Sequence, residues 1–207
     1  MAHVHTARPF NLRYICRDTI GEGGQDFRAT HRTAECNYLY IMRQNGHDEV
    51  GPTPDFASRS ADLVDTGRVA PLRAAKMPIT GRSLWVQADD LSRSRRPELA
   101  TAMHAVASLP VDRTPADWRQ MVLALCEDHI LSQGMIVDFG VHALAGDGDE
   151  WQVHPHAHLL ITARAWDASR GPGRRPAGWF CRETQVRELA EAWYAISGLL
   201  PTTVQAA

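Results

Sequence analysis

The chain has 207 residues and a formal net charge of −2, from 22 Lys and Arg against 24 Asp and Glu. This length and a hydrophobic content of 44% predict one globular domain with a real core, and the charge excludes a protein that coats nucleic acid indiscriminately. The four cysteines form no Cys-x-x-Cys pair, which excludes a zinc ribbon. Residues 1–13 lack the apolar core of a secretory signal, and no apolar run reaches membrane length, so we expect a cytoplasmic protein.

The first half of the chain predicts one strand and two helices. Residues 4–15 mix apolar and basic side chains and are expected to form the first strand. A helix is expected over residues 30–43, with Thr30 as its N-cap. A second helix is expected over residues 97–108, with Pro97 at its first position, where proline is well tolerated.

The second half predicts a helix, a hairpin and a final helix. Thr114 is the expected N-cap of a helix over residues 114–131. Apolar and polar side chains alternate over residues 135–142 and 151–162, which predicts two strands. Because only a short polar turn separates them, they should pair as an antiparallel hairpin. A last helix is expected over residues 183–197.

These elements predict an α/β fold of the α+β type, with a central antiparallel sheet and flanking helices. We expect the helices to pack mainly on the face opposite the candidate site described below. Residues 1–207 should form a single domain, with a mobile loop rich in Arg, Gly and Pro at about residues 167–178. Between Ala163 and Arg182, five arginines stand against one aspartate, so this segment is locally basic.

Three alternating histidines, His154, His156 and His158, are the most informative feature of the sequence. In a strand, alternate side chains point to the same face, so the three imidazoles should project from one side of the sheet. Imidazoles gathered on one face are suited to a divalent metal, whereas the bland alternative is a chance alternation on a solvated strand.

The neighbouring strand of the hairpin adds a further candidate ligand, His142. We take His142, His156 and His158 as the ligands, because a three-histidine set leaves coordination positions open, as catalytic metal sites do. His154 shares their face and is either a fourth ligand or a residue on the substrate side; we favour the second. Asp138 either orients a ligand imidazole or is a solvated edge residue.

Several motifs resemble the MobA/MobL (MobQ-type) family of plasmid relaxases, which belong to the HUH endonucleases. The resemblance is strong from Gly134-Met135-Ile136-Val137-Asp138 through Pro155-His156-Ala157-His158 to Thr162-Ala163-Arg164. In HUH enzymes two histidines flank one apolar residue, here Ala157. The segment Arg32–Arg43 resembles the one that bears the nucleophilic tyrosine of the family, and the likeness covers most of residues 30–165.

The resemblance implies a nicking reaction on single-stranded DNA. Tyr40 aligns with the tyrosine of the family and would attack the scissile phosphate to leave a 5′-phosphotyrosine, with Tyr38 as the runner-up. Tyr194 is the alternative expected of a replication initiator, in which the tyrosine follows the histidines. Asp138 or His104 would take the phenolic proton; His104 stands where the family commonly has a glutamate in a helix.

Cofactor and partners follow from the same resemblance. The metal would be Mn²⁺, Mg²⁺, Zn²⁺, Ni²⁺ or Co²⁺. The partner would be single-stranded DNA at a transfer origin, with accessory mobilisation proteins and a coupling protein, in the bacterial cytoplasm. DNA phosphates would be held by arginines, each of which could also be an ordinary surface residue: Arg43, Arg164, Arg174 and Arg175. The rival functions are a non-catalytic DNA-binding relative and a three-histidine zinc hydrolase.

Overall fold

A five-stranded antiparallel sheet forms the centre of the molecule. The computed structural model describes residues 9–16, 33–74, 76, 79, 81–93, 100–148, 150–176 and 182–201. Within these ranges the strand order is β1-β5-β7-β6-β4, and every neighbouring pair is antiparallel. The strands are β1 (Phe10–Cys16), β4 (Leu63–Val69), β5 (Ala100–Ser108), β6 (Val137–Ala145) and β7 (Trp151–Thr162). The predicted α+β class is therefore confirmed.

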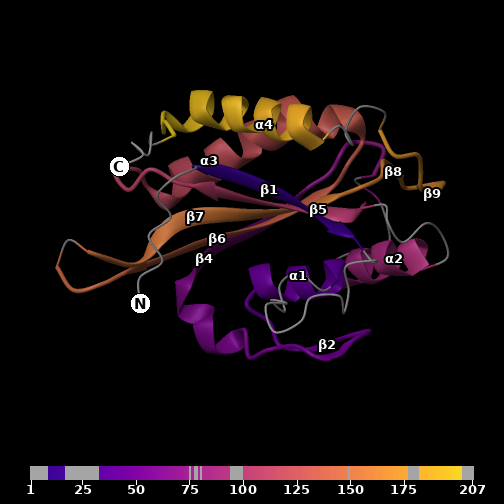
Figure 1. Cartoon of the computed structure of the whole chain (residues 1–207), viewed down its shortest axis with the longest axis horizontal. Coiled ribbons are helices and arrows are strands. Elements are labelled where there is room, and N and C mark those ends of the chain that lie inside the picture. Colours follow the sequence, from indigo (N-terminus) through magenta and orange to yellow (C-terminus); the bar gives the residue numbers. More distant parts are fainter. Residues whose placement is uncertain are drawn as a thin grey trace.

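Helices cover both faces of this sheet (Figure 1). The helices α3 (Pro115–Leu125) and α4 (Arg182–Ser197) lie on one face, and α1 (Ala34–Ile41) and α2 (Arg82–Arg93) lie on the other. The expectation that the helices pack mainly on one face is wrong, because α1 and α2 carry their own apolar surface. Ile41 and Trp85 are fully buried against Leu160 of β7 in a core of their own.

The second predicted helix, over residues 97–108, is also wrong. Residues 100–108 form β5, which pairs with β1 on one side and β7 on the other. Nearly all of β5 is buried, since both faces of this strand are covered. A strand buried on both faces loses its polar alternation, and an alanine-rich example then looks like a buried helix. Pro97 lies outside the described residues.

The predicted β6–β7 hairpin is confirmed, as are the helices on either side of it. Thr114 caps α3 as expected, in a capping box with Asp117. Helix α1 begins later than predicted: its N-cap is Thr33, whose Oγ1 accepts a hydrogen bond from the N–H of Cys36 at 2.9 Å. Thr30 lies outside the described residues.

Short elements connect the main ones. The segment expected to be a mobile loop contains the hairpin β8–β9, and residues 177 and 178 of that segment lie outside the described residues. Of the helices that the structure describes, none is both long and apolar enough to cross a bilayer. The short elements are β2 (His47–Asp48), β3 (Gly51–Pro52), η3 (Ala57–Asp62), η4 (Cys126–Ile130), η5 (Leu131–Gln133), β8 (Trp166–Asp167) and β9 (Gly171–Pro172).

Candidate metal centre and nucleophile

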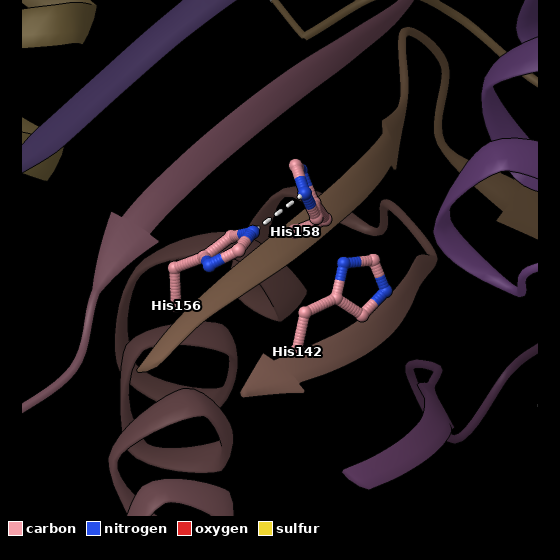
Figure 2. Close-up of side chains that lie close together, drawn as sticks. All are labelled: His142, His156 and His158. Atoms are coloured by element: carbon pink, nitrogen blue, oxygen red, sulfur yellow. Dashed lines mark hydrogen bonds between the residues drawn. The ribbon is translucent and has the colours of Figure 1, made fainter. Parts of the chain in front are cut away.

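The β6–β7 hairpin brings three imidazoles together (Figure 2). In the register of the hairpin His142 lies opposite His156, and Gly140 lies opposite His158. One nitrogen from each of the three rings lies within 4.8 Å of the others, and the residues are only 0%, 8% and 4% exposed. Three nitrogens at this spacing suit a divalent metal, and a set of three ligands leaves coordination positions open.

Two of the rings have a tautomer fixed by a main-chain carbonyl. The Nε2–H of His142 donates to the carbonyl of Ile41 at 2.9 Å, and the Nδ1–H of His156 donates to the carbonyl of His154 at 2.8 Å. Because a carbonyl only accepts, the other nitrogen of each ring keeps its lone pair. These lone pairs are on His142 Nδ1 and His156 Nε2, as a metal ligand requires. His154 itself is exposed and takes part here through its main chain.

Two of the three imidazoles, those of His142 and His158, are held in the neutral form. Burial lowers the pKa of His158 well below its usual value, and neighbouring histidines lower it further. Burial, with the adjacent guanidinium of Arg43, likewise lowers the pKa of His142. Neutral imidazoles can bind a cation at neutral pH without first losing a proton.

Arg43 lies beside the three imidazoles and not on the surface. It is 3% exposed, it pairs with Asp62 through Nε at 2.7 Å and Nη2 at 2.8 Å, and its Nη2 donates to His142 Nδ1 at 2.8 Å. The residue follows the end of α1 with a left-handed φ of 52°, which turns its side chain inward. The prediction that Arg43 grips a DNA phosphate is therefore wrong, because the guanidinium is buried and already paired.

Tyr40 is the tyrosine that the structure places against the histidines. Its ring centre lies 5.1 Å from that of His158 and 6.4 Å from those of His142 and His104. The guanidinium carbon of Arg43 lies 4.8 Å from the centre of the Tyr40 ring.

The two other candidate tyrosines lie elsewhere. Tyr38 packs against the α2 side of the core, and burial raises its pKa, with a further contribution from Asp138. Tyr194 is on α4 and packs into the core on the opposite face of the sheet (Figure 1). Helix α1 therefore presents only Tyr40, of these three, to the imidazoles.

A glycine lets α1 approach the centre closely. A Cβ added at Gly140 would lie 2.4 Å from the carbonyl oxygen of Ile41 and 3.3 Å from His142 Nε2. Any larger residue on β6 at this point would push α1 off the sheet. Gly140 thus allows the hydrogen bond between His142 and Ile41, and with it the position of Tyr40.

Asp138 does not orient a ligand imidazole. Its two carboxylate oxygens each accept a hydrogen bond from Arg68 at 2.6 Å, and the indole N–H of Trp85 donates to one of them at 2.7 Å. The carboxylate is buried, and its ion pair with the guanidinium offsets the free-energy cost of removing the charge from water. The predicted role is therefore corrected: Asp138 ties β4 and α2 to the sheet.

His104 comes from β5 and contacts the third ligand. Its Nε2 lies 2.9 Å from His158 Nδ1, and its Nδ1 lies 2.7 Å from Asn37 Oδ1 and 2.8 Å from a guanidinium nitrogen of Arg13. Arg13 and Asn37 were missed from the sequence. Arg13 stands directly opposite His104 in the β1–β5 register, a signal that is visible only once residues 100–108 are known to be a strand.

The remaining predicted arginines lie past the far end of β7. Arg164 donates to the carbonyl of Gly173 at 3.0 Å, Arg174 is exposed, and Arg175 lines a cavity with Trp166. Thr162, where β7 ends, is about 13 Å along the strand from His158 at ~3.3 Å per residue. These arginines thus lie beside the sheet edge rather than within the imidazole cluster.

The antiparallel sheet, the three inward-facing imidazole nitrogens and the tyrosine above them define an α+β protein with a candidate metal-dependent site. The family model of the MobA/MobL family matches residues 34–186. The chain therefore belongs to the MobA/MobL family, the one that its motifs resemble.

Two further comparisons are more distant. The chain is 26% identical over 170 residues, 81% of its length, to the multifunctional non-homologous end joining protein LigD of Mycolicibacterium smegmatis, of which it spans only 22%. It is also similar to a solved structure described as "Molecular Basis of Vancomycin Resistance Transfer in Staphylococcus aureus", with a TM-score of 0.67 and 18% identity. That match covers 91% of this chain and 89% of the other. The second likeness shows the fold.

Proposed function

We propose that the chain is a relaxase of plasmid mobilisation, which nicks one DNA strand at a transfer origin and can rejoin it. Membership of the MobA/MobL family supports this function. The observation that carries the mechanism is the position of Tyr40, with its ring 5.1 Å from that of His158 and on the same face of the sheet as all three imidazoles.

The donor set fits a divalent ion. His156 and His158 would bind through Nε2, since their Nδ1 atoms face hydrogen-bond partners in the protein. His142 would bind through Nδ1 once the Arg43 N–H that now donates to this nitrogen has turned away. When bound, Mn²⁺, Mg²⁺, Zn²⁺, Ni²⁺ or Co²⁺ would supply Lewis-acid polarisation of a non-bridging phosphate oxygen.

The nucleophile is the phenol oxygen of Tyr40. It forms a bond to phosphorus while the bond from phosphorus to the 3′ oxygen breaks, so the products are a 5′-phosphotyrosine and a free 3′-hydroxyl. An ordinary tyrosine has a pKa of about 10 and reacts slowly at neutral pH. The Arg43 guanidinium, which is paired with Asp62, lies 4.8 Å from the centre of the Tyr40 ring. Of the two predicted proton acceptors, His104 lies beside Tyr40, whereas Asp138 is engaged with Arg68.

Binding of the DNA strand is assigned to residues beyond the imidazoles. Arg164, Arg174 and Arg175 remain the proposed phosphate contacts, and Arg43 is removed from that set. Accessory mobilisation proteins and a coupling protein in the bacterial cytoplasm remain part of the proposal. Because phosphate contacts release counterions, replacing one of these arginines should lower the salt dependence of DNA binding.

A covalent-adduct assay tests the nucleophile. Labelled single-stranded oligonucleotides that tile the origin of the replicon encoding the chain are incubated with protein and Mn²⁺, then run on a denaturing gel. We expect wild type, Tyr38→Phe and Tyr194→Phe to form a protein–DNA adduct and Tyr40→Phe to form none. An adduct that persists in Tyr40→Phe and disappears in Tyr194→Phe would replace the proposal with a replication-initiator mechanism.

One observation favours a second candidate, a DNA-binding relative with weakened cleavage. By the motif resemblance, His104 stands where the family commonly has a glutamate, and it contacts His158. This candidate predicts bound metal and tight binding of the origin strand with no adduct on any tiled oligonucleotide. Adduct formation by the wild-type chain excludes it.

A further inference from the structure

One nitrogen of His104 lies within hydrogen-bond distance of both an acceptor and a donor. Its Nδ1 lies 2.7 Å from the carbonyl oxygen of the Asn37 side chain, which only accepts hydrogen bonds. The same nitrogen lies 2.8 Å from the guanidinium of Arg13, which only donates. A neutral imidazole nitrogen is either a donor or an acceptor, so His104 can satisfy only one of these partners at a time.

The partner of His104 Nδ1 decides whether His104 Nε2 carries a proton. Because Nε2 is hydrogen-bonded to His158 Nδ1, this partner also decides the tautomer of His158. If His104 donates to Asn37, its Nε2 accepts from His158 Nδ1–H, and His158 Nε2 keeps a lone pair. If Arg13 donates to His104, the Nε2–H of His104 donates to His158 Nδ1, and the proton of His158 is on Nε2.

The pattern in which Arg13 donates to His104 fits the site without metal, called the empty pattern below. The pattern in which His104 donates to Asn37 fits the site with metal bound, called the loaded pattern. His158 Nε2 lies 3.1 Å from His156 Nε2, whose lone pair is fixed by the bond from His156 Nδ1–H to a carbonyl. Two lone pairs at that distance repel. Without a cation, His158 therefore carries its proton on Nε2 and donates it to His156 Nε2. A metal needs both lone pairs, and His158 must then carry its proton on Nδ1.

We propose that His104 is a positioning residue that exchanges its Arg13 partner for Asn37 when metal binds, and so changes the tautomer of His158. The inference rests on the proposed metal site. Both rings stay neutral: the Nε2 proton of His104 passes to His158 Nδ1, the Nε2 proton of His158 leaves to solvent, and His104 Nδ1 takes one from solvent. No net proton is gained or lost.

The exchange connects the metal to the tyrosine helix. Asn37 is on α1, three residues before Tyr40. Its side-chain oxygen already accepts from Arg13 at 2.6 Å and gains His104 as a second donor only in the loaded pattern. The carbonyl of Ile41 on the same helix holds His142. Metal binding therefore adds a second contact to α1, at Asn37, to the contact at Ile41 that is present without metal. A glutamate in place of His104 would only accept from His158, and so would suit the loaded pattern alone.

Nitrogen NMR of the full chain tests the exchange directly. Long-range ¹H–¹⁵N correlations distinguish Nδ1–H from Nε2–H imidazoles, and Zn²⁺ is a diamagnetic probe. We expect His104 and His158 to change from Nε2–H to Nδ1–H on loading, while His142 and His156 keep their tautomers as internal controls. An unchanged His104 overturns the inference. If Zn²⁺ moves the resonances of none of the ligand histidines, the proposed metal site itself fails, so the two failures are distinguishable.

Two substitutions have opposite expected effects on Zn²⁺ affinity in calorimetric titrations. Asn37→Leu removes the acceptor of the loaded pattern and should weaken binding by about 10-fold or more. Arg13→Met removes the donor of the empty pattern and should tighten binding a few-fold. A purely structural role would weaken binding in both, so unchanged or weaker binding by Arg13→Met overturns the inference. The wild-type NMR result decides the matter if either variant does not fold.

Discussion

Replacing Gly140 with alanine should displace the tyrosine helix. The added Cβ would lie 2.4 Å from the Ile41 carbonyl oxygen. An ordinary carbon–oxygen contact is about 3.4 Å, so α1 must retreat by ~1 Å. The hydrogen bond from His142 to Ile41, now 2.9 Å, would then lengthen to about 3.9 Å and be lost.

This displacement should lower both the stability of the Gly140→Ala variant and its rate of adduct formation. Overpacking at such a contact costs about 1–3 kcal/mol, and the lost hydrogen bond about 1 kcal/mol more. A displacement of ~1 Å at a reacting group can lower a rate by about 100-fold. Urea denaturation measures the first effect, and the rate of adduct formation at saturating Mn²⁺ measures the second.

The matched control is Gly146→Ala in the β6–β7 turn. A Cβ there would lie 3.2 Å from the Glu150 carbonyl, a contact that a few tenths of an ångström relieve, and it lies away from α1. This variant should nick at nearly the wild-type rate. If Gly140→Ala also nicks within twofold of wild type, the close approach of α1 to β6 is not what positions Tyr40, and the reasoning fails.

Three other changes have measurable outcomes. Arg43→Met should lower the free energy of unfolding by about 3–5 kcal/mol, because the buried Asp62 loses its partner, and adding Asp62→Leu should restore most of it; a loss below about 1 kcal/mol would contradict a buried ion pair. Burial raises the pKa of Asp89, which accepts from the N–H groups of Ala34 and Glu35, to about 7. The folded chain then keeps a proton that the unfolded chain releases above about pH 4, so stability should fall by up to ~1.4 kcal/mol per unit as pH rises toward 7. Denaturation at pH 5 and 8 should show a smaller fall in Asp89→Asn, and equal falls would refute the assignment. EDTA should abolish adduct formation and Mn²⁺ should restore it; an adduct that survives exhaustive chelation would exclude a metal role.

The sequence predicts those parts of the fold that have one solvated or polar face. Strands β6 and β7 alternate, and α3 carries a capping box, so all three elements were identified, although α3 ends at Leu125 and not near residue 131. Strand β5 was misread because its burial on both faces removes the alternation. The position of α1 and α2 on the second face of the sheet was missed. Their buried residues contact strands that are distant in sequence, and the local hydrophobic pattern does not indicate such contacts.

The same distinction holds for the candidate site. The three imidazoles could be predicted to converge because hairpin register brings alternate residues together. The partners of charged side chains could not be: Arg43 and Asp138 were assigned outward or catalytic roles, yet each has a buried partner distant in sequence, Asp62 and Arg68 respectively. Pairings of this kind depend on how the layers dock, which periodicity does not specify.

The bond between His142 and Ile41 joins residues that are 101 positions apart. Helix α1 is therefore synthesised long before the hairpin that carries the imidazoles, and closing so long a loop is slow. Until β6 and β7 take their places in the sheet, a nascent chain has a tyrosine without the groups that would activate it. The separation of the two halves makes complete folding a precondition for any reaction with DNA.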